Sequence, residues 1–359
     1  MRTVELMPIM AEKGVRFDYC TLIEGQGELD SRIAELGGRI YTCPLKPFWS
    51  FGRRLTRFLE QTRYDIVHSH SHYFSGYIVR QAHKAGIKGR IVHFRNTFDD
   101  KSPTLYRKFY LRTTRKWISV HATAMLAVCR GAMELSWRKD WRQDPRCRVI
   151  YNGLDLSNYK GSGNYREDVR RELGLCDDSK LIINVARFIR LKGHDIFIDA
   201  AARILSEEPA LHFLLVGDGE LSDVIKLKTR ELGIDKQVHF LGKRSDVPRL
   251  LMASDCFVLP SRFEGLPGVV LESLAAQLPV VATNLPGVRE IAEHTDLISI
   301  VSVEDSDAIC KEVLKIVRND GIRRRAEHPF PQMFDLSHCA ENLFEIYKEQ
   351  VGCFSNIQA

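Results

Sequence analysis

Short apolar runs alternate with longer helix-type segments along the whole chain, and this alternation is typical of the α/β class. Each apolar run is followed by a segment that favours a helix, so we expect parallel sheets covered by helices. In the second half, the runs that predict strands are residues 181–186, 211–216, 238–241, 256–259, 280–282 and 298–301. The length of 359 residues exceeds what one core usually serves, which favours two domains.

The first half carries its own series of strand signals, at residues 16–22, 39–43, 66–69, 90–94, 123–128 and 148–150. A polar, Gly-rich stretch follows Asn152-Gly153 and separates the two series. We therefore expect domains over residues 1–152 and 153–334, and a C-terminal helix within 335–359 that packs back on the first domain. The chain opens on a helix-type stretch, whereas a doubly wound domain normally opens on a strand and a Gly-rich turn. We expect that this first strand is missing, through a late start or a truncation.

The segment Ser261-Arg-Phe-Glu-Gly-Leu-Pro-Gly-Val-Val-Leu-Glu272 follows a predicted buried strand and opens a predicted helix. Free N–H groups at such a helix start bind phosphate. Glu264 precedes the helix, and Glu272 lies about 6 Å along its axis from Gly268, within reach of a hydroxyl of an attached sugar. The segment predicts a site for a nucleotide-diphosphate sugar. An ordinary α/β turn with solvated carboxylates is the alternative.

Three other predicted strand ends carry residues that suit a phosphate. The residues concerned are Arg187, Lys192, Gly217, Asp218, Gly219, Gly242 and Lys243. The carboxyl ends of parallel strands meet at one edge of a sheet, so these residues are expected to share one crevice. Arg and Lys can hold a diphosphate as a fork and as a compact charge. Two cations and a helix start can neutralise a diphosphate without a metal, so we expect no metal cofactor there.

The predicted first domain contains a His-rich stretch, Asp65-Ile-Val-His68-Ser-His70-Ser-His72, and a second candidate in Ile91-Val-His93-Phe-Arg95. A His-x-His-x-His string can indicate a metal site. Alternating strand side chains are expected to splay, however, and no Cys or carboxylate cluster accompanies them, so we expect no bound metal. Contact of His70 and His72 with an acceptor or a donor sugar is the expectation, and hydrogen-bonded structural histidines are the alternative.

The net charge of +6 is unevenly distributed along the chain. Residues 107–148 hold eleven Lys/Arg and three Asp/Glu, a balance of +8, together with several aromatic residues. This mixture favours contact with an anionic membrane surface. Binding of nucleic acid is not expected, and a solvated helix face with its aromatics turned to the core is the alternative. Nine cysteines without a C-x-x-C pair favour reduced thiols and a cytoplasmic location.

Several motifs together resemble the retaining glycosyltransferases of family 4. They are Asn152-Gly-Leu-Asp155, Arg187 with Lys192-Gly193, Val216-Gly-Asp-Gly219, Glu264 with Glu272 as an E-x7-E pair, and Phe344-Glu-Ile-Tyr347 in the closing helix. The resemblance implies the GT-B architecture, in which two Rossmann-like, doubly wound parallel-sheet domains face a cleft. It also implies transfer of a sugar from a nucleotide-diphosphate sugar to a glycan or lipid-linked acceptor, in surface polysaccharide or glycolipid synthesis.

Carried over by position, the resemblance implies roles for individual residues. Arg187 and Lys192 would hold the donor diphosphate, Glu264 would contact the donor sugar, and Glu272 would bond the ribose. The backbone of Gly265, Leu266, Pro267, Gly268 and Val269 would cradle phosphate and sugar. The family's functional His at the end of the strand over 90–94 falls on Arg95 here, with His93 two residues earlier.

Two alternative functions stay open from the sequence. A nucleotide-sugar epimerase would convert the nucleotide-sugar without an acceptor. An inactive nucleotide-sugar-binding protein would bind the donor without turnover, and the expected loss of the first strand motivates this alternative. An NAD oxidoreductase is disfavoured because no G-x-G-x-x-G follows a predicted strand.

Overall fold

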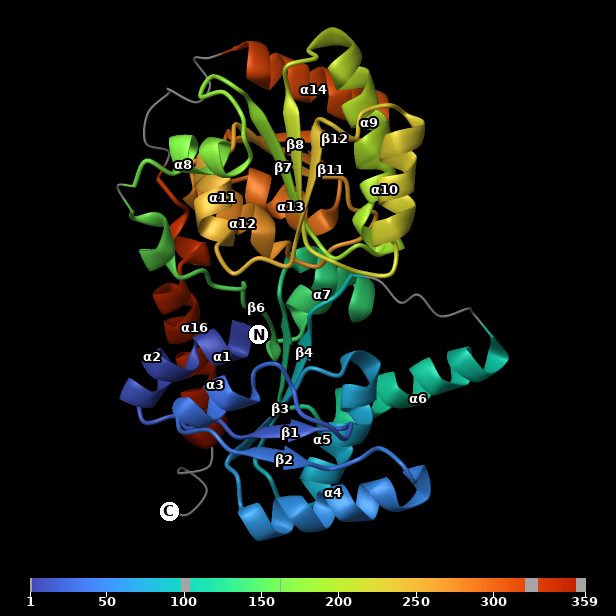
Figure 1. The fold of residues 1–359 in the computed structure, drawn as a ribbon. Helices are drawn as coiled ribbons and strands as arrows, with labels where there is room; N and C mark the ends of the chain where they lie inside the picture. The colour runs from blue at the N-terminus through green and yellow to red at the C-terminus, as the bar shows by residue number, and fades with distance from the viewer. Residues whose placement is uncertain (1, 98–103, 162, 320–328, 353–359) are drawn as a thin grey trace. The chain divides into compact units, whose positions relative to one another are not determined.

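The computed structural model describes residues 2–97, 104–161, 163–319 and 329–352. Residue contacts divide the chain into two units (Figure 1). Unit 1 comprises Met1–Asp155 with Met333–Ala359, and unit 2 comprises Leu156–Gln332. Every strand pairing in the described residues is parallel, so the α/β prediction is confirmed.

Unit 2 is built on one six-stranded sheet in the order β12-β11-β10-β7-β8-β9. The strands are β7 (Leu181–Val185), β8 (His212–Val216), β9 (Val238–Gly242), β10 (Cys256–Leu259), β11 (Val280–Thr283) and β12 (Ile298–Val301). The order in which the chain adds strands reverses between β7 and β10, as in doubly wound dinucleotide-binding domains. Ligands bind such sheets at this reversal, outside the carboxyl ends of the strands.

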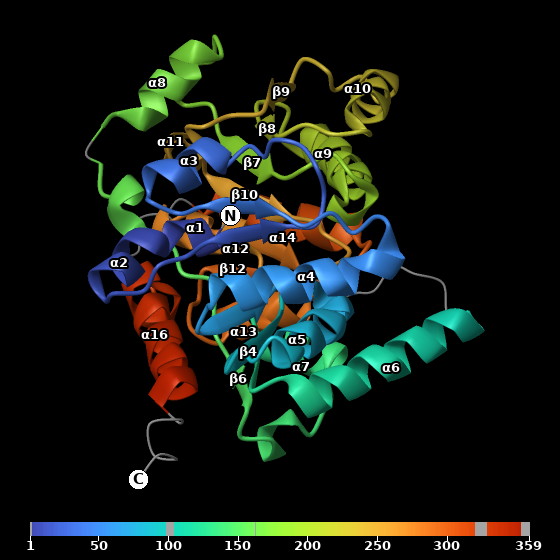
Figure 2. The ribbon, with the colours of Figure 1, turned by 90° about the horizontal axis from the view of Figure 1, so that it is seen from below.

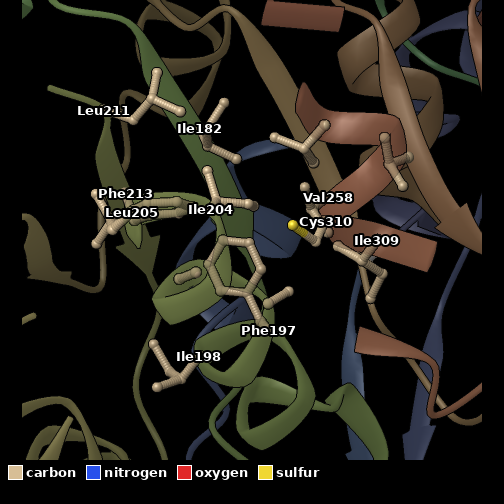
Figure 3. Close-up of a cluster of buried hydrophobic side chains, with 14 of the residues drawn as sticks. Ile182, Phe197, Ile198, Ile204, Leu205, Leu211, Phe213, Val258, Ile309 and Cys310 are labelled. Atoms are coloured by element: carbon tan, nitrogen blue, oxygen red, sulfur yellow. The ribbon is translucent and has the colours of Figure 1, made fainter. Parts of the chain in front are cut away.

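Helices alternate with the strands of unit 2, beginning with α8 before β7, and enclose an apolar core. The helices are α8 (Tyr165–Glu172), α9 (His194–Glu207), α10 (Ser222–Glu231), α11 (Val247–Ala253), α12 (Gly268–Ala275), α13 (Pro286–Ala292) and α14 (Ser306–Arg318). Figure 3 shows one face of the core, where Phe197 and Ile204 of α9 meet Ile182 and Val258 of the sheet. The strands read as continuous apolar runs because both faces of the sheet are covered.

A buried charge network holds the amino ends of the two central strands of unit 2. Arg170 of α8 is fully buried, and its Nη2 bonds Asp255 Oδ2 at 2.9 Å. The same Asp255 oxygen accepts from the backbone N–H of Leu181 at 2.8 Å, and Arg166 bonds its other oxygen at 2.6 Å. Asp255 therefore links the start of β7 to the start of β10, at the opposite edge from the predicted site.

Unit 1 contains two separate parallel sheets. One pairs β1 (Tyr19–Thr21) with β2 (Ile40–Thr42), and the other has the order β3-β4-β5-β6. The bounds of the larger sheet are β3 (Ile66–Ser69), β4 (Gly89–Phe94), β5 (Ala124–Ala127) and β6 (Cys147–Val149). A cavity of about 570 Å³ is lined by residues of both β1 and β3, together with residues of the closing helix.

The helices of unit 1 are α1 (Arg2–Glu5), α2 (Met7–Glu12), α3 (Asp30–Glu35), α4 (Phe48–Thr62), α5 (Ser75–Lys84), α6 (Leu105–His121), α7 (Arg130–Ser136) and α16 (Leu336–Gly352). The closing helix α16 packs on α2, β3 and β4. Leu343 and Ile346 of α16 share a buried cluster with Met10 and Ile91. Helix α5 contacts both α4 and α6 (Figure 2).

Three sequence expectations differ from the structure of unit 1. The strand expected over residues 16–22 is shorter, because only Tyr19–Thr21 pairs with a neighbour. The sequence also predicts a helix over residues 53–61, but helix α4 begins earlier, at Phe48 directly after Pro47. Helix α7 was not predicted. Among the described residues, no helix combines the length and the apolar character needed to cross a membrane.

Candidate functional site

The structure brings Lys192 and Glu264 together at the strand-order reversal of unit 2. Lys192 follows β7 and Glu264 follows β10, two strands that are neighbours in the sheet but far apart in the sequence. Lys192 Nζ lies 2.6 Å from Glu264 Oε1. Both side chains are largely covered, with 24% and 12% exposure, so the pair is screened less than a surface ion pair. A cation and a carboxylate are thus fixed where a ligand of this fold would bind.

Ser261 fixes the carboxylate of Glu264 from the other side. Its hydroxyl donates to Glu264 Oε1 at 2.8 Å, and Ser261 itself is fully buried. Thr283 of β11 in turn donates to the carbonyl oxygen of Ser261 at 2.6 Å. The carboxylate therefore has a set orientation before any ligand arrives, which is the condition for preorganised electrostatics.

Two glycines allow the loops of this site to pack closely. At Gly193, which has φ +67°, an added Cβ would lie 2.1 Å from the carbonyl oxygen of Pro260. At Gly287 the same atom would lie 1.9 Å from the carbonyl oxygen of Gly265. Side chains at either position would displace the loop that carries Glu264.

The predicted phosphate cradle forms the start of helix α12. Pro267 is the N-cap residue, and no side chain caps the helix. In its first turn, the N–H of Val270 bonds the carbonyl oxygen of Pro267 at 3.1 Å, whereas the N–H groups of Gly268 and Val269 make no hydrogen bond to the described residues. Gly265, Leu266, Gly268 and Val269 surround this start, and Glu272 lies further along the helix. This geometry suits an anion.

The turn after β8 places Gly217, Asp218 and Gly219 next to the loop after β7. A Cβ on Gly217, which has φ +133°, would lie 2.0 Å from the carbonyl oxygen of Ala186. Asp218 Oδ1 accepts from Gly219 N at 2.8 Å and from Ser222 Oγ at 3.0 Å. These bonds lower the pKa of Asp218, and they show that its carboxylate closes the turn.

Arg187, a predicted site residue, is exposed directly after β7. Its guanidinium makes no hydrogen bond or ion pair to the residues that the structure describes.

Arg262 was not predicted from the sequence as a site residue. Its guanidinium bonds Asp195 Oδ2 and Glu304 Oε1, each at 2.8 Å, and the carbonyl oxygen of Arg190 at 2.7 Å. The partners lie 67, 42 and 72 residues away, so no local spacing indicated this role. Ser261 was also not predicted as a site residue, although its partner Glu264 lies only three residues further along the chain.

Unit 1 brings three histidines together at the carboxyl ends of β3 and β4. The ring centroids are 4.3 Å apart for His68 and His70, and 5.2 Å apart for each of these with His93. The expectation that alternating side chains would splay is wrong here. Side chains two residues apart share a face of the strand, and His93 adds a third ring from the neighbouring strand.

The three histidine rings are neutral in this environment. Burial lowers the pKa of His68 and His93 well below the usual value, and the charge of Arg95 acts in the same direction. Burial and Arg95 also lower the pKa of His70. His70 is exposed by surface area, but it lines the cavity of unit 1, so its open face lies toward that cavity.

The other predicted residues of unit 1 lie outside this cluster. His72 Nε2 lies 3.3 Å from the hydroxyl of Ser136. Arg95 Nη2 donates to Asn152 Oδ1 at 3.0 Å. The structure therefore groups His93 with His68, a residue that was not singled out as a site candidate, rather than with His72 or Arg95.

Comparison with known proteins adds the family. The profile described as "Glycosyl transferases group 1" matches residues 165–328, and "Glycosyl transferase 4-like domain" matches residues 1–153. The chain is 28% identical over 279 residues to the UDP-Gal:alpha-D-GlcNAc-diphosphoundecaprenol alpha-1,3-galactosyltransferase of Escherichia coli, covering 73% of this chain and 68% of that protein. It is 26% identical over 305 residues to the capsular polysaccharide biosynthesis glycosyltransferase CapH of Staphylococcus aureus, covering 82% and 80%.

Solved structures match the fold. The Anabaena HepE crystal structure in complex with UDP superposes with a TM-score of 0.80 at 21% identity, covering 96% of each chain. The two profiles together span most of the chain. The two relatives named above are glycosyltransferases by name, which does not favour an epimerase. The chain therefore belongs to the group 1 glycosyltransferases of the family 4 type, with the GT-B fold.

Proposed function

We propose that this glycosyltransferase takes its sugar from a UDP-sugar and transfers it with retention of the anomeric configuration. The observation that carries the proposal is the Lys192–Glu264 pair, 2.6 Å apart, at the strand-order reversal of unit 2. The loop that carries Glu264 leads directly into the uncapped start of α12, so the cation, the carboxylate and the helix start form one site. The E. coli relative named above acts on UDP-Gal by its name, which supports uridine as the donor base.

Each end of the donor has a matching group. Lys192 and Arg187 stabilise the diphosphate as its charge grows during departure from the sugar, and the N–H groups at the start of α12 add to this. Glu264, oriented by Ser261 and Lys192, bonds a hydroxyl of the sugar. Glu272 bonds the ribose. Because these groups neutralise the diphosphate, the donor half of the reaction proceeds without a metal.

We propose a glycan or lipid-linked acceptor in surface polysaccharide or glycolipid synthesis. The names of the E. coli and S. aureus relatives, a diphosphoundecaprenol-linked acceptor and capsular polysaccharide, support this class. His70 and His72 stay as predictions for contact with the acceptor. His93 and Arg95 stay as candidates for the catalytic residue of the first domain, and the ring of His93 is only 4% exposed.

The donor assignment is tested by thermal-shift screening of nucleotide-sugars. A ligand that binds the folded state raises the melting temperature, and one at 100 times its Kd stabilises by about 2.7 kcal/mol. We expect a shift with UDP-sugars that is reduced in Lys192→Gln and kept in Lys226→Gln, because Lys226 is ion-paired with the exposed Asp223. A full panel without any shift in the wild-type chain would refute the proposal. Product NMR then reports the anomeric configuration.

We also propose that the enzyme docks on the cytoplasmic face of an anionic membrane through helix α6. Leu105, Tyr106 and Phe109 of this helix are 83%, 80% and 70% exposed. The exposed basic residues Lys108, Arg112 and Lys116 lie on the same helix. Exposed aromatics beside cations suit a headgroup surface. Trp137 and Trp141, also in the basic segment, are buried and do not take part.

Co-sedimentation with vesicles containing anionic lipid tests this docking surface. We expect binding at low salt that weakens at high salt, since each basic residue contributes about 1 kcal/mol near such a surface. The triple change Lys108→Glu, Arg112→Glu and Lys116→Glu should abolish it. The matched control reverses three exposed basic residues of α14, Lys311, Lys315 and Arg318, where the helix shows no exposed aromatic. Equal loss of vesicle binding in both triple variants would contradict docking through α6, because binding would then depend only on the net charge of the protein.

A further inference from the structure

The His68, His70 and His93 side chains offer three nitrogen ligands at one point in unit 1. One ligand nitrogen from each ring can be chosen so that all three lie within 4.8 Å of one another. His68 Nε2 and His93 Nδ1 are already 3.1 Å apart. Two nitrogens bound to one tetrahedral zinc at about 2.0–2.1 Å would be separated by roughly 3.3 Å. The pair therefore needs almost no movement to share an ion, and His70 needs a modest side-chain rotation.

His93 presents its ligand nitrogen from a buried ring. The ring is 4% exposed, and the nitrogen that faces His68 is Nδ1. The other nitrogen, Nε2, makes no hydrogen bond to the residues that the structure describes, so no bond on that side holds the ring in one tautomer. Metal binding at Nδ1 would place the ring proton on Nε2 and would replace the contact between His68 and His93.

Tyr347 supplies the support that a metal-bound histidine usually has. Its hydroxyl oxygen lies 2.7 Å from His68 Nδ1, which leaves His68 Nε2 directed at the cluster. Burial raises the pKa of Tyr347, so the phenol stays protonated and neutral. Hydrogen bonding of the far ring nitrogen fixes both tautomer and ring orientation in metal sites.

The chemistry of the three ligands selects the type of ion. Neutral imidazoles suit Zn²⁺, Co²⁺, Ni²⁺ and Cu²⁺, whereas Mg²⁺ and Ca²⁺ prefer oxygen ligands. The described residues place no carboxylate or thiolate in the cluster. His68 and His70 line the 570 Å³ cavity, so a fourth coordination position would open toward it. Three protein ligands with an open position are the pattern of zinc sites that act on a bound molecule.

We propose that His68, His70 and His93 bind one Zn²⁺-class ion, with its open coordination position facing the cavity of unit 1. All three ligands belong to unit 1, whereas the residues of the donor diphosphate site belong to unit 2, and the proposal does not depend on the function proposed above. It replaces the sequence-based expectation that the His-rich stretch holds no metal. The nearby charge of Arg95 opposes a cation, which favours moderate rather than extreme affinity.

The test is titration of Co²⁺ into the tag-free full chain after removal of metals with EDTA. We expect one equivalent to bind with the visible absorption of a tetrahedral site, and Zn²⁺ to displace it. His70→Ala removes a ligand whose side chain faces the cavity, so folding is kept while affinity falls by at least about 100-fold. Tyr347→Phe should lower the affinity by about 10-fold, the effect of removing the support of a ligand.

The control uses a histidine pair for which the described residues supply no third ligand. His212 Nδ1 and His239 Nε2 of unit 2 are also 3.1 Å apart, so His212→Ala removes a similar contact without touching the cluster. The stoichiometry and affinity should stay unchanged in this variant. Absence of Co²⁺ binding to the wild-type chain would overturn the proposal, and so would binding that survives His70→Ala at full affinity.

Discussion

The two units handle polar groups in opposite ways. Unit 2 holds paired charges in its interior, with Arg170–Asp255 at one edge of the sheet and Lys192–Glu264 at the other. Unit 1 instead has a cluster of neutral groups, the imidazoles of His68 and His93 and the phenol of Tyr347, and two of these residues, His68 and Tyr347, line its cavity. Fixed charges suit a ligand that is itself charged, such as a diphosphate, whereas neutral rings suit a metal or an uncharged hydroxyl. The difference indicates which kind of chemistry each unit contributes.

The largest effect is expected at the buried charge network of unit 2. Asp255→Asn removes the anion that faces the fully buried Arg170. Leaving a buried charge unpaired costs about 3–5 kcal/mol, so the free energy of unfolding should fall by that amount. Urea unfolding followed by circular dichroism measures it. The control Asp223→Asn loses an ion pair whose carboxylate is 98% exposed, and it should change stability by less than about 0.5 kcal/mol. Similar losses in both variants would show that the interior charges of unit 2 are not special.

Glu264→Gln should affect turnover much more than stability, because Lys192, which is 24% exposed, can still be solvated in the variant. The amide can keep the bond from Ser261, but it no longer offers a carboxylate to Lys192 and to the donor sugar. Loss of a preorganised electrostatic group costs about 100-fold to 1000-fold in rate. Arg187→Ala should reduce the rate similarly, because it removes a cation that holds the donor diphosphate. Stability should not change, because the exposed guanidinium has no structural partner among the described residues. Steady-state transfer assays and melting temperatures check both variants. Normal turnover in either one contradicts its assigned role.

His194 is the neutral exception inside the charged unit. The ring is 1% exposed, stacks on Phe188 at 4.1 Å, and has no hydrogen bond on either nitrogen among the described residues. Burial lowers its pKa to about 4. The unfolded chain takes up a proton near pH 6.5 and the folded chain only near pH 4, so stability is lost as the pH falls through this window.

The expected loss from His194 is about 3 kcal/mol between pH 7 and pH 4. In His194→Phe the dependence of the unfolding free energy on pH should be correspondingly flatter. Urea unfolding at a series of pH values measures the slopes. Parallel curves for wild type and His194→Phe would mean that the buried ring does not drive the acid sensitivity.

The smallest effect is expected at two tyrosines beside the cavity of unit 1. The hydroxyl of Tyr19 is buried and makes no hydrogen bond to the described residues, so Tyr19→Phe should be neutral or stabilising by under about 1 kcal/mol. The hydroxyl of Tyr64 donates to Asp18 Oδ2 at 2.6 Å, so Tyr64→Phe should cost about 1–3 kcal/mol. Melting temperatures compare the two. A cost at Tyr19 equal to that at Tyr64 would show that the Tyr19 hydroxyl has a partner in solution.

Local sequence patterns predicted much of the fold and of the donor site. The predicted strands 66–69, 256–259 and 298–301 match β3, β10 and β12, because continuous apolar runs bounded by turns are clear signals. The strand ends that carry Lys192 and Glu264 were also predicted to share one edge, since parallel strands place their carboxyl ends together. These strand positions and the shared position of the two residues could be predicted from the fold class alone.

The rest depended on which strands are neighbours and in what register. His93 joins His68 and His70 because β4 lies beside β3 with Ile91 opposite His68, and no local pattern states that pairing. The contacts of Arg262 likewise depend on three loops that meet only after folding. The separate sheet of β1 and β2 was also not predicted, because the sequence of a strand does not determine which other strand pairs with it.

The return of α16 to unit 1 sets an order of events during synthesis on the ribosome. Unit 2 is one continuous stretch, whereas the core around Met10 and Ile91 is completed by Leu343 and Ile346 near the other end of the chain. At about 5–20 residues per second, the first segment of unit 1 waits roughly ten to forty seconds for this helix. Unit 2 can thus be finished before unit 1 is, and the nascent chain has apolar surface to shield during that interval.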